Sequence, residues 1–131
     1  MLSGSGIALT LDTGHLMIGG NDVLVLATSA PDRIAHTHLK DVDNTIAEKV
    51  RGGRLTYTEA VTQGMYRPLG TGDVDIAAIV NTLQGNGYGG WYTLEQDTIL
   101  TEEPQGEGPV RDVRISADYV SGLLAAASVS Q

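Results

Sequence analysis

The sequence predicts an α/β fold made of parallel strands that alternate with helices. Short apolar runs at residues 7–11, 33–39 and 91–95 have the length and composition of strands. Helix-like segments follow them, and this alternation is typical of parallel strand–helix units. Ionisable residues stand at the carboxyl end of each strand, where sites in such folds are built.

The first two strands are separated by one helix. Residues 7–11 place large apolar side chains at odd positions and small ones at even positions, as in a strand with two different faces. Asn21 or Asp22 is expected to cap a short helix over residues 23–27. The second strand, residues 33–39, follows directly.

A long polar stretch from residue 42 to residue 68 contains two shorter helical patterns. These cover residues 45–50 and 58–63, and glycines close both. Asp75 is expected to cap a third helix, whose apolar residues recur at helical spacing over residues 76–83.

The third strand leads into the last helix through an acidic loop. The loop covers residues 98–110 and is rich in Pro and Gly, and the helix is expected over residues 112–127. Residues 128–131 are expected to form a frayed tail, and Trp91 is expected in the core. The whole chain, residues 1–131, is interpreted as a single domain.

Charge and composition exclude several classes of function. The 131 residues carry a net charge of −8, which disfavours binding to nucleic-acid phosphates. The chain has no cysteine, so neither disulfides nor thiolate metal sites can form. No apolar run approaches the roughly 20 residues of a membrane span, and no signal-peptide pattern is present. We therefore expect a cytoplasmic protein with no membrane partner.

Three side chains at strand ends are expected to meet at one point. Strand alternation places Asp12, His38 and Glu95 on one face of the sheet, each near a carboxyl end. A carboxylate, an imidazole and a second carboxylate form an oxygen and nitrogen ligand set that suits Mn²⁺, Mg²⁺, Co²⁺ or Zn²⁺.

Four motifs resemble the sugar phosphate isomerase/epimerase superfamily, which has the xylose-isomerase-like TIM barrel. They are Leu11–Leu16 with Gly19-Gly20, then Arg33–Asp41, then Pro68–Asp75, and finally Gly87–Trp91 followed by Glu95-Gln96-Asp97. The last motif looks most like the inosose dehydratase branch, which acts on keto-inositols. The resemblance covers only the C-terminal part of the family barrel. It implies a partial TIM barrel of about three parallel βα units, equivalent to strands six to eight.

The resemblance also implies a divalent metal cofactor and its ligands. Family members hold the metal with two Glu, one Asp and one His, and Asp12, His38 and Glu95 match three of these. The fourth ligand, a Glu of the fifth family strand, is expected upstream of this chain. Glu95 also matches a ligand that serves as an acid or base in isomerising members. His15 matches a residue that contacts substrate or an oxygen near the metal, which gives it a catalytic and a substrate-binding role.

Three further charged residues have two interpretations each. Lys40 is expected at the edge of the site, near a substrate hydroxyl or phosphate, although Lys40 and Asp41 also fit a solvated ion pair. Arg67 is predicted to reach substrate, although it also fits an ordinary surface arginine. Asp97 fits either support of the metal ligands or a helix cap.

The implied chemistry is metal-assisted enolisation of a sugar or cyclitol. The metal lowers the cost of removing the proton beside a carbonyl, and a carboxylate takes that proton. An isomerase or epimerase returns the proton elsewhere, whereas a dehydratase expels a β-hydroxyl. Two alternatives stay open: a non-catalytic fragment or split subunit that completes a barrel, and a relative of the apurinic-site endonucleases. The acidic charge and the shortage of further histidines disfavour the endonuclease.

Three parallel strands alone leave two open sheet edges. Open edges template pairing with another chain. We therefore expect a homo-oligomer or association with a missing N-terminal half.

Overall fold

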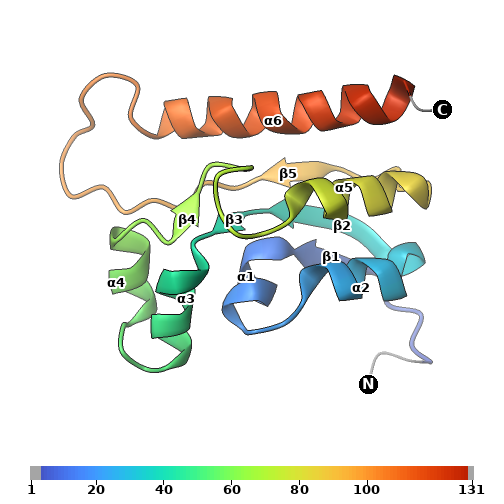
Figure 1. Cartoon of the computed structure of the whole chain (residues 1–131), viewed down its shortest axis with the longest axis horizontal. Coiled ribbons are helices and arrows are strands. Elements are labelled where there is room, and N and C mark those ends of the chain that lie inside the picture. Colours follow the sequence, from blue (N-terminus) through green and yellow to red (C-terminus); the bar gives the residue numbers. More distant parts are fainter. Residues whose placement is uncertain (1–3, 130–131) are drawn as a thin grey trace.

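The computed structural model describes residues 4–129 as a small sheet with helices beside it (Figure 1). Its elements, in chain order, are β1 (Leu9–Asp12), α1 (Thr13–Ile18), α2 (Val23–Ser29), a 3₁₀ turn (Pro31–Arg33), β2 (Ile34–Leu39), β3 (Asp41–Val42), α3 (Asn44–Arg51), α4 (Tyr57–Thr62), β4 (Tyr66–Arg67), α5 (Ile76–Gly85), β5 (Tyr92–Leu94) and α6 (Pro109–Val129).

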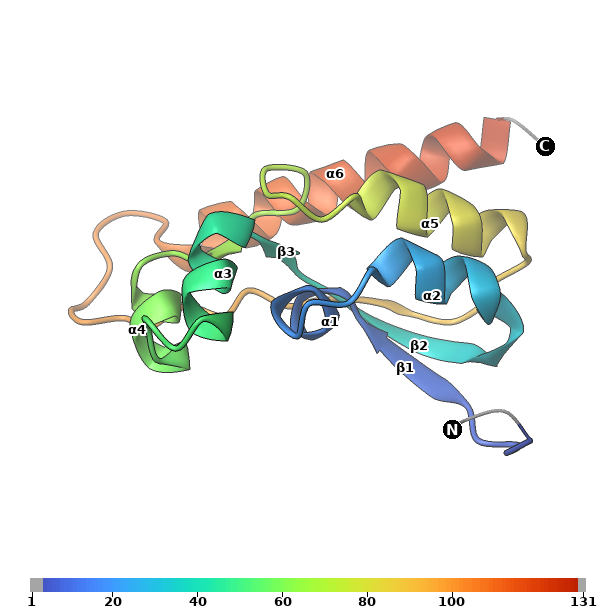
Figure 2. The same cartoon turned by 60° about the horizontal axis from the view of Figure 1, so that its bottom comes forward.

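The main sheet has three parallel strands in the order β1-β2-β5. This confirms the predicted α/β fold with three parallel strands. Helices α2, α5 and α6 all lie on one side of the sheet (Figure 2). Leu11, Thr37 and Leu39 are almost fully buried, whereas their neighbours Thr10 and His36 retain exposed surface. The sheet is therefore covered on one face and accessible on the other.

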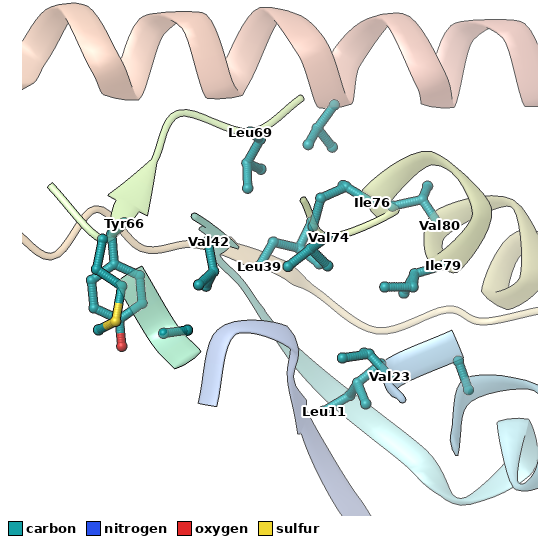
Figure 3. Packing of buried hydrophobic residues seen from close by; sticks show 14 of the residues in the cluster. Leu11, Val23, Leu39, Val42, Tyr66, Leu69, Val74, Ile76, Ile79 and Val80 are labelled. Carbon is teal, nitrogen blue, oxygen red and sulfur yellow. The ribbon is translucent and has the colours of Figure 1, made fainter. Parts of the chain in front are cut away.

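The hydrophobic core fills the space between the sheet and the helices (Figure 3). Leu39 from β2 lies close to Val74 and to the buried face of α5, which includes Ile76 and Ile79. Removing apolar surface from water stabilises this layer by about 25 cal/mol per Å². Within residues 4–129, the helices therefore pack against one face of the strands, and the polar ends of the strands lie outside the core.

Helix caps explain where most helices begin. Asp22 accepts a hydrogen bond from the Val25 amide and Asp75 accepts one from the Ala78 amide, so both predicted caps are present. The predicted helices at 45–50 and 58–63 are α3 and α4, with ends that differ by one residue. Helix α1 was not predicted from the sequence. It is only six residues long and begins directly after β1.

The segment between β2 and α5 contains a second, two-stranded sheet. Strands β3 and β4 pair antiparallel, with Asp41 opposite Arg67. The Asp41 carboxylate is buried and accepts hydrogen bonds from the amides of Val42, Gly70, Gly72 and Val74. This carboxylate therefore fixes the glycine-rich loop that precedes α5.

Two expectations about the C-terminal third were wrong. Trp91 is 80% exposed rather than buried, because it precedes β5 on a part of the sheet that no described element covers. Its backbone is nevertheless held, since its carbonyl accepts hydrogen bonds from the Thr37 and Tyr88 hydroxyl groups.

The last helix is also longer than expected. Helix α6 begins at Pro109, three residues earlier than expected, because proline is favoured in the first turn of a helix. It continues through Val129, into the segment that was expected to fray, whereas residues 130–131 lie outside the described residues. None of the helices within residues 4–129 is both long and apolar enough to cross a membrane.

Candidate metal centre

The strand register brings the three candidate ligands to one edge of the sheet. Asp12 of β1 pairs with His38 of β2, and His38 pairs with Thr93 of β5. Glu95 follows two residues after Thr93, on the same face, and its amide donates to the Leu39 carbonyl. Parallel pairing thus places the side chains of Asp12, His38 and Glu95 together, and we call them the three-residue cluster.

The three-residue cluster has dimensions that suit a metal ion. His38 Nδ1 lies 3.1 Å from Glu95 Oε1 and 3.8 Å from Asp12 Oδ2. One ligand atom from each residue lies within 4.8 Å of the other two. Metal–ligand bonds of about 2.0–2.6 Å require such separations between ligand atoms. All three side chains are partly exposed, at 18% for Asp12, 32% for His38 and 30% for Glu95, so a solute can reach them.

Helix α1 fixes the position of Asp12 and His15. The Asp12 carboxylate caps α1, since its Oδ1 accepts a hydrogen bond from the His15 amide at 2.9 Å. Its Oδ2 lies 2.9 Å from Nδ1 of the His15 ring. The ring is otherwise open, with 54% of the side chain exposed. His15 is therefore tied to the cluster through Asp12 and still faces solvent.

Lys40 lies beside the three-residue cluster, not in solvent. Its ammonium nitrogen is 2.7 Å from Glu95 Oε2, 3.0 Å from Asp97 Oδ2 and 3.6 Å from Asp12 Oδ2, and its side chain is only 4% exposed. The alternative of a solvated ion pair between Lys40 and Asp41 is thus wrong. Asp41 is bonded to backbone amides instead.

Charge is unevenly balanced around the cluster. Burial lowers the pKa of Lys40, but hydrogen bonds to Glu95 and Asp97 and the charge of Asp12 outweigh it and raise the pKa above its ordinary value. Lys40 is therefore a cation at neutral pH. Three carboxylates then face one ammonium group, and two negative charges remain uncompensated when the imidazoles are neutral. A divalent cation would balance these charges, so the residues present fit such an ion.

The other predicted site residues lie at varying distances from this centre. Asp97 joins it through Lys40. Arg67 instead pairs with Asp43 at 3.0 Å on the small second sheet. Its predicted contact with substrate stays a prediction, as do the ligand roles of the cluster. His36 precedes His38 by two residues on the same strand face, and its Nε2 lies 3.2 Å from the Thr93 hydroxyl group.

Thr13 and Gly14 have functions that the sequence reasoning missed. The Thr13 hydroxyl accepts the Lys40 amide at 2.8 Å and donates to the Lys40 carbonyl at 2.7 Å. A Cβ on Gly14 would lie only 2.7 Å from Lys40 Cβ. These two residues hold β1 and α1 tightly against the end of β2. In the sequence, only the motif Asp-Thr-Gly-His at residues 12–15 indicates this contact.

Several known proteins are similar to this chain over part of their own length. The chain is 29% identical over 126 residues to the rhizopine catabolism protein MocC of Rhizobium meliloti, which covers 96% of this chain and 38% of that protein. It is 36% identical over 91 residues to an inosose dehydratase of Geobacillus thermodenitrificans, and this match covers 70% of this chain and 30% of that protein. An inosose dehydratase of Lactiplantibacillus plantarum is 30% identical over 118 residues, and this match covers 90% of this chain and 38% of that protein. The chain thus spans about a third of the length of these relatives.

A family model agrees with the fold. The model described as a xylose isomerase-like TIM barrel matches residues 3–115, which is most of the chain. The match includes all three parallel strands and the three-residue cluster. The chain therefore belongs to the xylose isomerase-like TIM barrel family.

Proposed function

We propose that this chain forms part of a metal-dependent site that removes a proton beside the carbonyl group of a keto-inositol or sugar. The observation that supports it most is the three-residue cluster, whose donor atoms and unbalanced negative charge suit a divalent cation. The relatives named inosose dehydratases favour a keto-inositol and a dehydration. This donor set suits Mn²⁺, Co²⁺, Mg²⁺ or Zn²⁺.

The residues of the chain have separate roles in this proposal. Asp12, His38 and Glu95 would hold the cation, which would supply polarisation of the substrate carbonyl. Glu95 would also act as the general acid or base that moves a proton at the adjacent carbon. His15 is oriented by Asp12 through Nδ1, and its Nε2 would contact a substrate hydroxyl.

Dehydration needs one proton removed and one hydroxyl group expelled. The base takes the proton from the carbon beside the carbonyl, and the electron pair of the C–H bond forms an enolate. When the enolate re-forms the carbonyl, a C=C bond forms between the α and β carbons and the C–O bond at the β carbon breaks. The hydroxyl leaves as water because it receives a proton from an acid such as His15. In an isomerisation the enolate would instead be protonated at the former carbonyl carbon, and the hydroxyl on the adjacent carbon would become the new carbonyl.

The complete site would require further strands. Among the described residues, strand β1 pairs only with β2, and a hollow of about 320 Å³ lies along it, lined mainly by apolar residues such as Leu9, Leu16 and Leu26. An unpaired strand edge beside an apolar hollow suits a further parallel strand–helix unit. We infer that another part of a barrel, rather than a second copy of this chain, associates there. Size-exclusion chromatography with light scattering tests this, and a stable dimer of the chain alone would favour the second copy.

A non-catalytic role is the second candidate. The open β1 edge favours it, because a chain that needs another unit to complete its site would show little turnover alone. Such a chain would serve as a split subunit that completes a barrel. The two candidates differ in whether the isolated chain moves the proton.

Deuterium exchange separates the candidates. The chain is incubated in D₂O with Mn²⁺ and an inosose, and ¹H NMR follows loss of the signal beside the carbonyl. We expect exchange above the rate with Mn²⁺ alone, and return to that rate in Glu95→Gln. Exchange no faster than with Mn²⁺ alone, in a chain that binds Mn²⁺, would contradict the catalytic proposal and favour the non-catalytic one.

A further inference from the structure

Lys40 is more deeply buried than any side chain of the three-residue cluster. Its stem passes beneath the first turn of α1, where Gly14 has no side chain and Thr13 hydrogen-bonds both backbone groups of Lys40. The ammonium nitrogen also lies 5.5 Å from the centre of the Tyr66 ring, a distance at which a cation is attracted to the aromatic face. Backbone and side chain are therefore both fixed before any ligand is present.

The ammonium group of Lys40 separates the two oxygens of the Glu95 carboxylate. Glu95 directs Oε2 to Lys40 at 2.7 Å and Oε1 to His38 Nδ1 at 3.1 Å. Asp97 directs Oδ2 to Lys40 at 3.0 Å. One oxygen of Glu95 is thereby held by Lys40, and the other faces the point where the three-residue cluster meets.

We propose that Lys40 is a positioning residue whose ammonium group gathers Asp12, Glu95 and Asp97 and keeps one oxygen of Glu95 directed at the cation position. In doing so it stands in for part of the positive charge that the carboxylates need. The part of this inference that concerns the cation rests on the proposed function. The part that concerns the carboxylates does not.

This role differs from the substrate contact predicted from the sequence. The Lys40 ammonium nitrogen lies within hydrogen-bond distance of Glu95 and Asp97, and Asp12 lies 3.6 Å away. Its side chain is 4% exposed, compared with 54% for His15. A substrate hydroxyl therefore has little access to Lys40, whereas His15 is directly accessible.

The test replaces Lys40 by an uncharged residue of similar shape and measures the metal-free chain. Lys40→Met keeps most of the stem packing, and Lys49→Met, at the only other lysine of the chain, is the control. Hydrogen exchange of the Glu95 amide, which bonds to Leu39, is followed by NMR with a chelator present. We expect exchange at least about tenfold faster in Lys40→Met and no change in the control, because three carboxylates then repel one another. Parent-like exchange in Lys40→Met would overturn the proposal.

A second pair of variants decides the matter if Lys40→Met folds poorly. Asp97 is 42% exposed, so Asp97→Asn is expected to fold. Alone, it should speed exchange of the Glu95 amide about twofold to fivefold, because Lys40 loses one partner. In a Lys40→Gln chain, Asp97→Asn should instead slow this exchange, because one of the repelling charges is removed. The same effect of Asp97→Asn in both backgrounds would show that Lys40 does not gather the carboxylates.

The cation part is tested separately. If calorimetry shows that the parent chain binds Mn²⁺, saturating Mn²⁺ should raise the melting temperature of Lys40→Met more than that of the parent, because the metal restores a missing charge. An equal or smaller rise would contradict the stand-in role. A parent chain that binds no Mn²⁺ would sink the proposed function, and the chelator experiment would still decide the role of Lys40.

Discussion

Two neighbouring residues, Lys40 and Asp41, are both buried and charged but belong to different regions. Lys40 stands at the carboxyl edge of the three-stranded sheet and contacts the side chains of Asp12, Glu95 and Asp97. Asp41 stands in the small β3–β4 sheet and contacts backbone amides of the loop before α5. At the sheet edge, partly exposed carboxylates surround the ammonium group of Lys40. In the β3–β4 region, backbone amide donors surround the carboxylate of Asp41.

The difference indicates which region can bind a ligand. The Asp41 carboxylate has no spare capacity, because four amides already donate to its two oxygens. It stabilises the fold and is closed to other partners. At the sheet edge the carboxylates exceed the ammonium group in charge and retain exposed surface. A buried charge that backbone amides satisfy therefore stabilises the fold. A buried charge that only other side chains satisfy marks a region that can bind a ligand.

The largest effect should come from the Asp41 region. We expect Asp41→Ala to destabilise the chain by about 3 kcal/mol or more, because buried amides lose a charged acceptor. Gly72→Ala should also destabilise it, since a Cβ there would collide with the Asp41 carboxylate. Urea unfolding at neutral pH measures both, with the exposed Asp32→Ala as the control. If Asp41→Ala loses less than 1 kcal/mol, Asp41 is not the anchor of this loop.

The second-largest effect is expected on Mn²⁺ binding, with the free energy of unfolding nearly unchanged. His38→Gln is expected to weaken Mn²⁺ binding about 100-fold, because it replaces the imidazole ligand. His36→Gln, two residues earlier on the same strand face, is the matched control and should weaken binding no more than about threefold. Calorimetry and urea unfolding on both variants give the comparison. Equal losses in the two variants would contradict His38 as a ligand.

The smallest effect should come from Arg67. The hydrogen bond from Arg67 lowers the pKa of Asp43 below its ordinary value. The ion pair therefore contributes stability above the ordinary carboxyl range, and this contribution is lost as the pH falls through the pKa of the folded state. Because the pair is partly exposed, we expect Arg67→Gln to cost only about 0.5 kcal/mol at pH 7.

Thermal unfolding across the acid range checks this expectation. The difference between Arg67→Gln and the parent should shrink below about pH 4 and vanish in stronger acid. A constant difference at every pH would show that Arg67 acts through something other than the charge of Asp43. A change in inosose binding by Arg67→Gln would support the substrate contact that the sequence predicted.

Local patterns were sufficient to predict the strands and most helices. Alternation along residues 7–11 and 33–39 depends only on neighbouring positions, and the caps at Asp22 and Asp75 act within one turn. Parallel pairing then follows from the strand–helix order. The convergence of carboxylate and imidazole groups at one sheet edge could be predicted for the same reason.

Distant contacts that do not follow from the order of the strands could not be predicted. The contact of Lys40 with Asp97 joins residues 57 positions apart, and no local pattern encodes it. The β3–β4 sheet has only two residues in each strand, too few for an alternation to be visible. Trp91 was expected in the core, but it is exposed, because no described element covers the sheet face beside it.

The most direct test of the central claim is calorimetric titration of the chain with Mn²⁺ at neutral pH, for the parent and for Glu95→Gln. We expect one site per chain with a dissociation constant of about 10 μM or lower, and binding at least about 30-fold weaker in Glu95→Gln. Equal affinity in both proteins, or no heat of binding in the parent, would contradict a cation site formed by Asp12, His38 and Glu95.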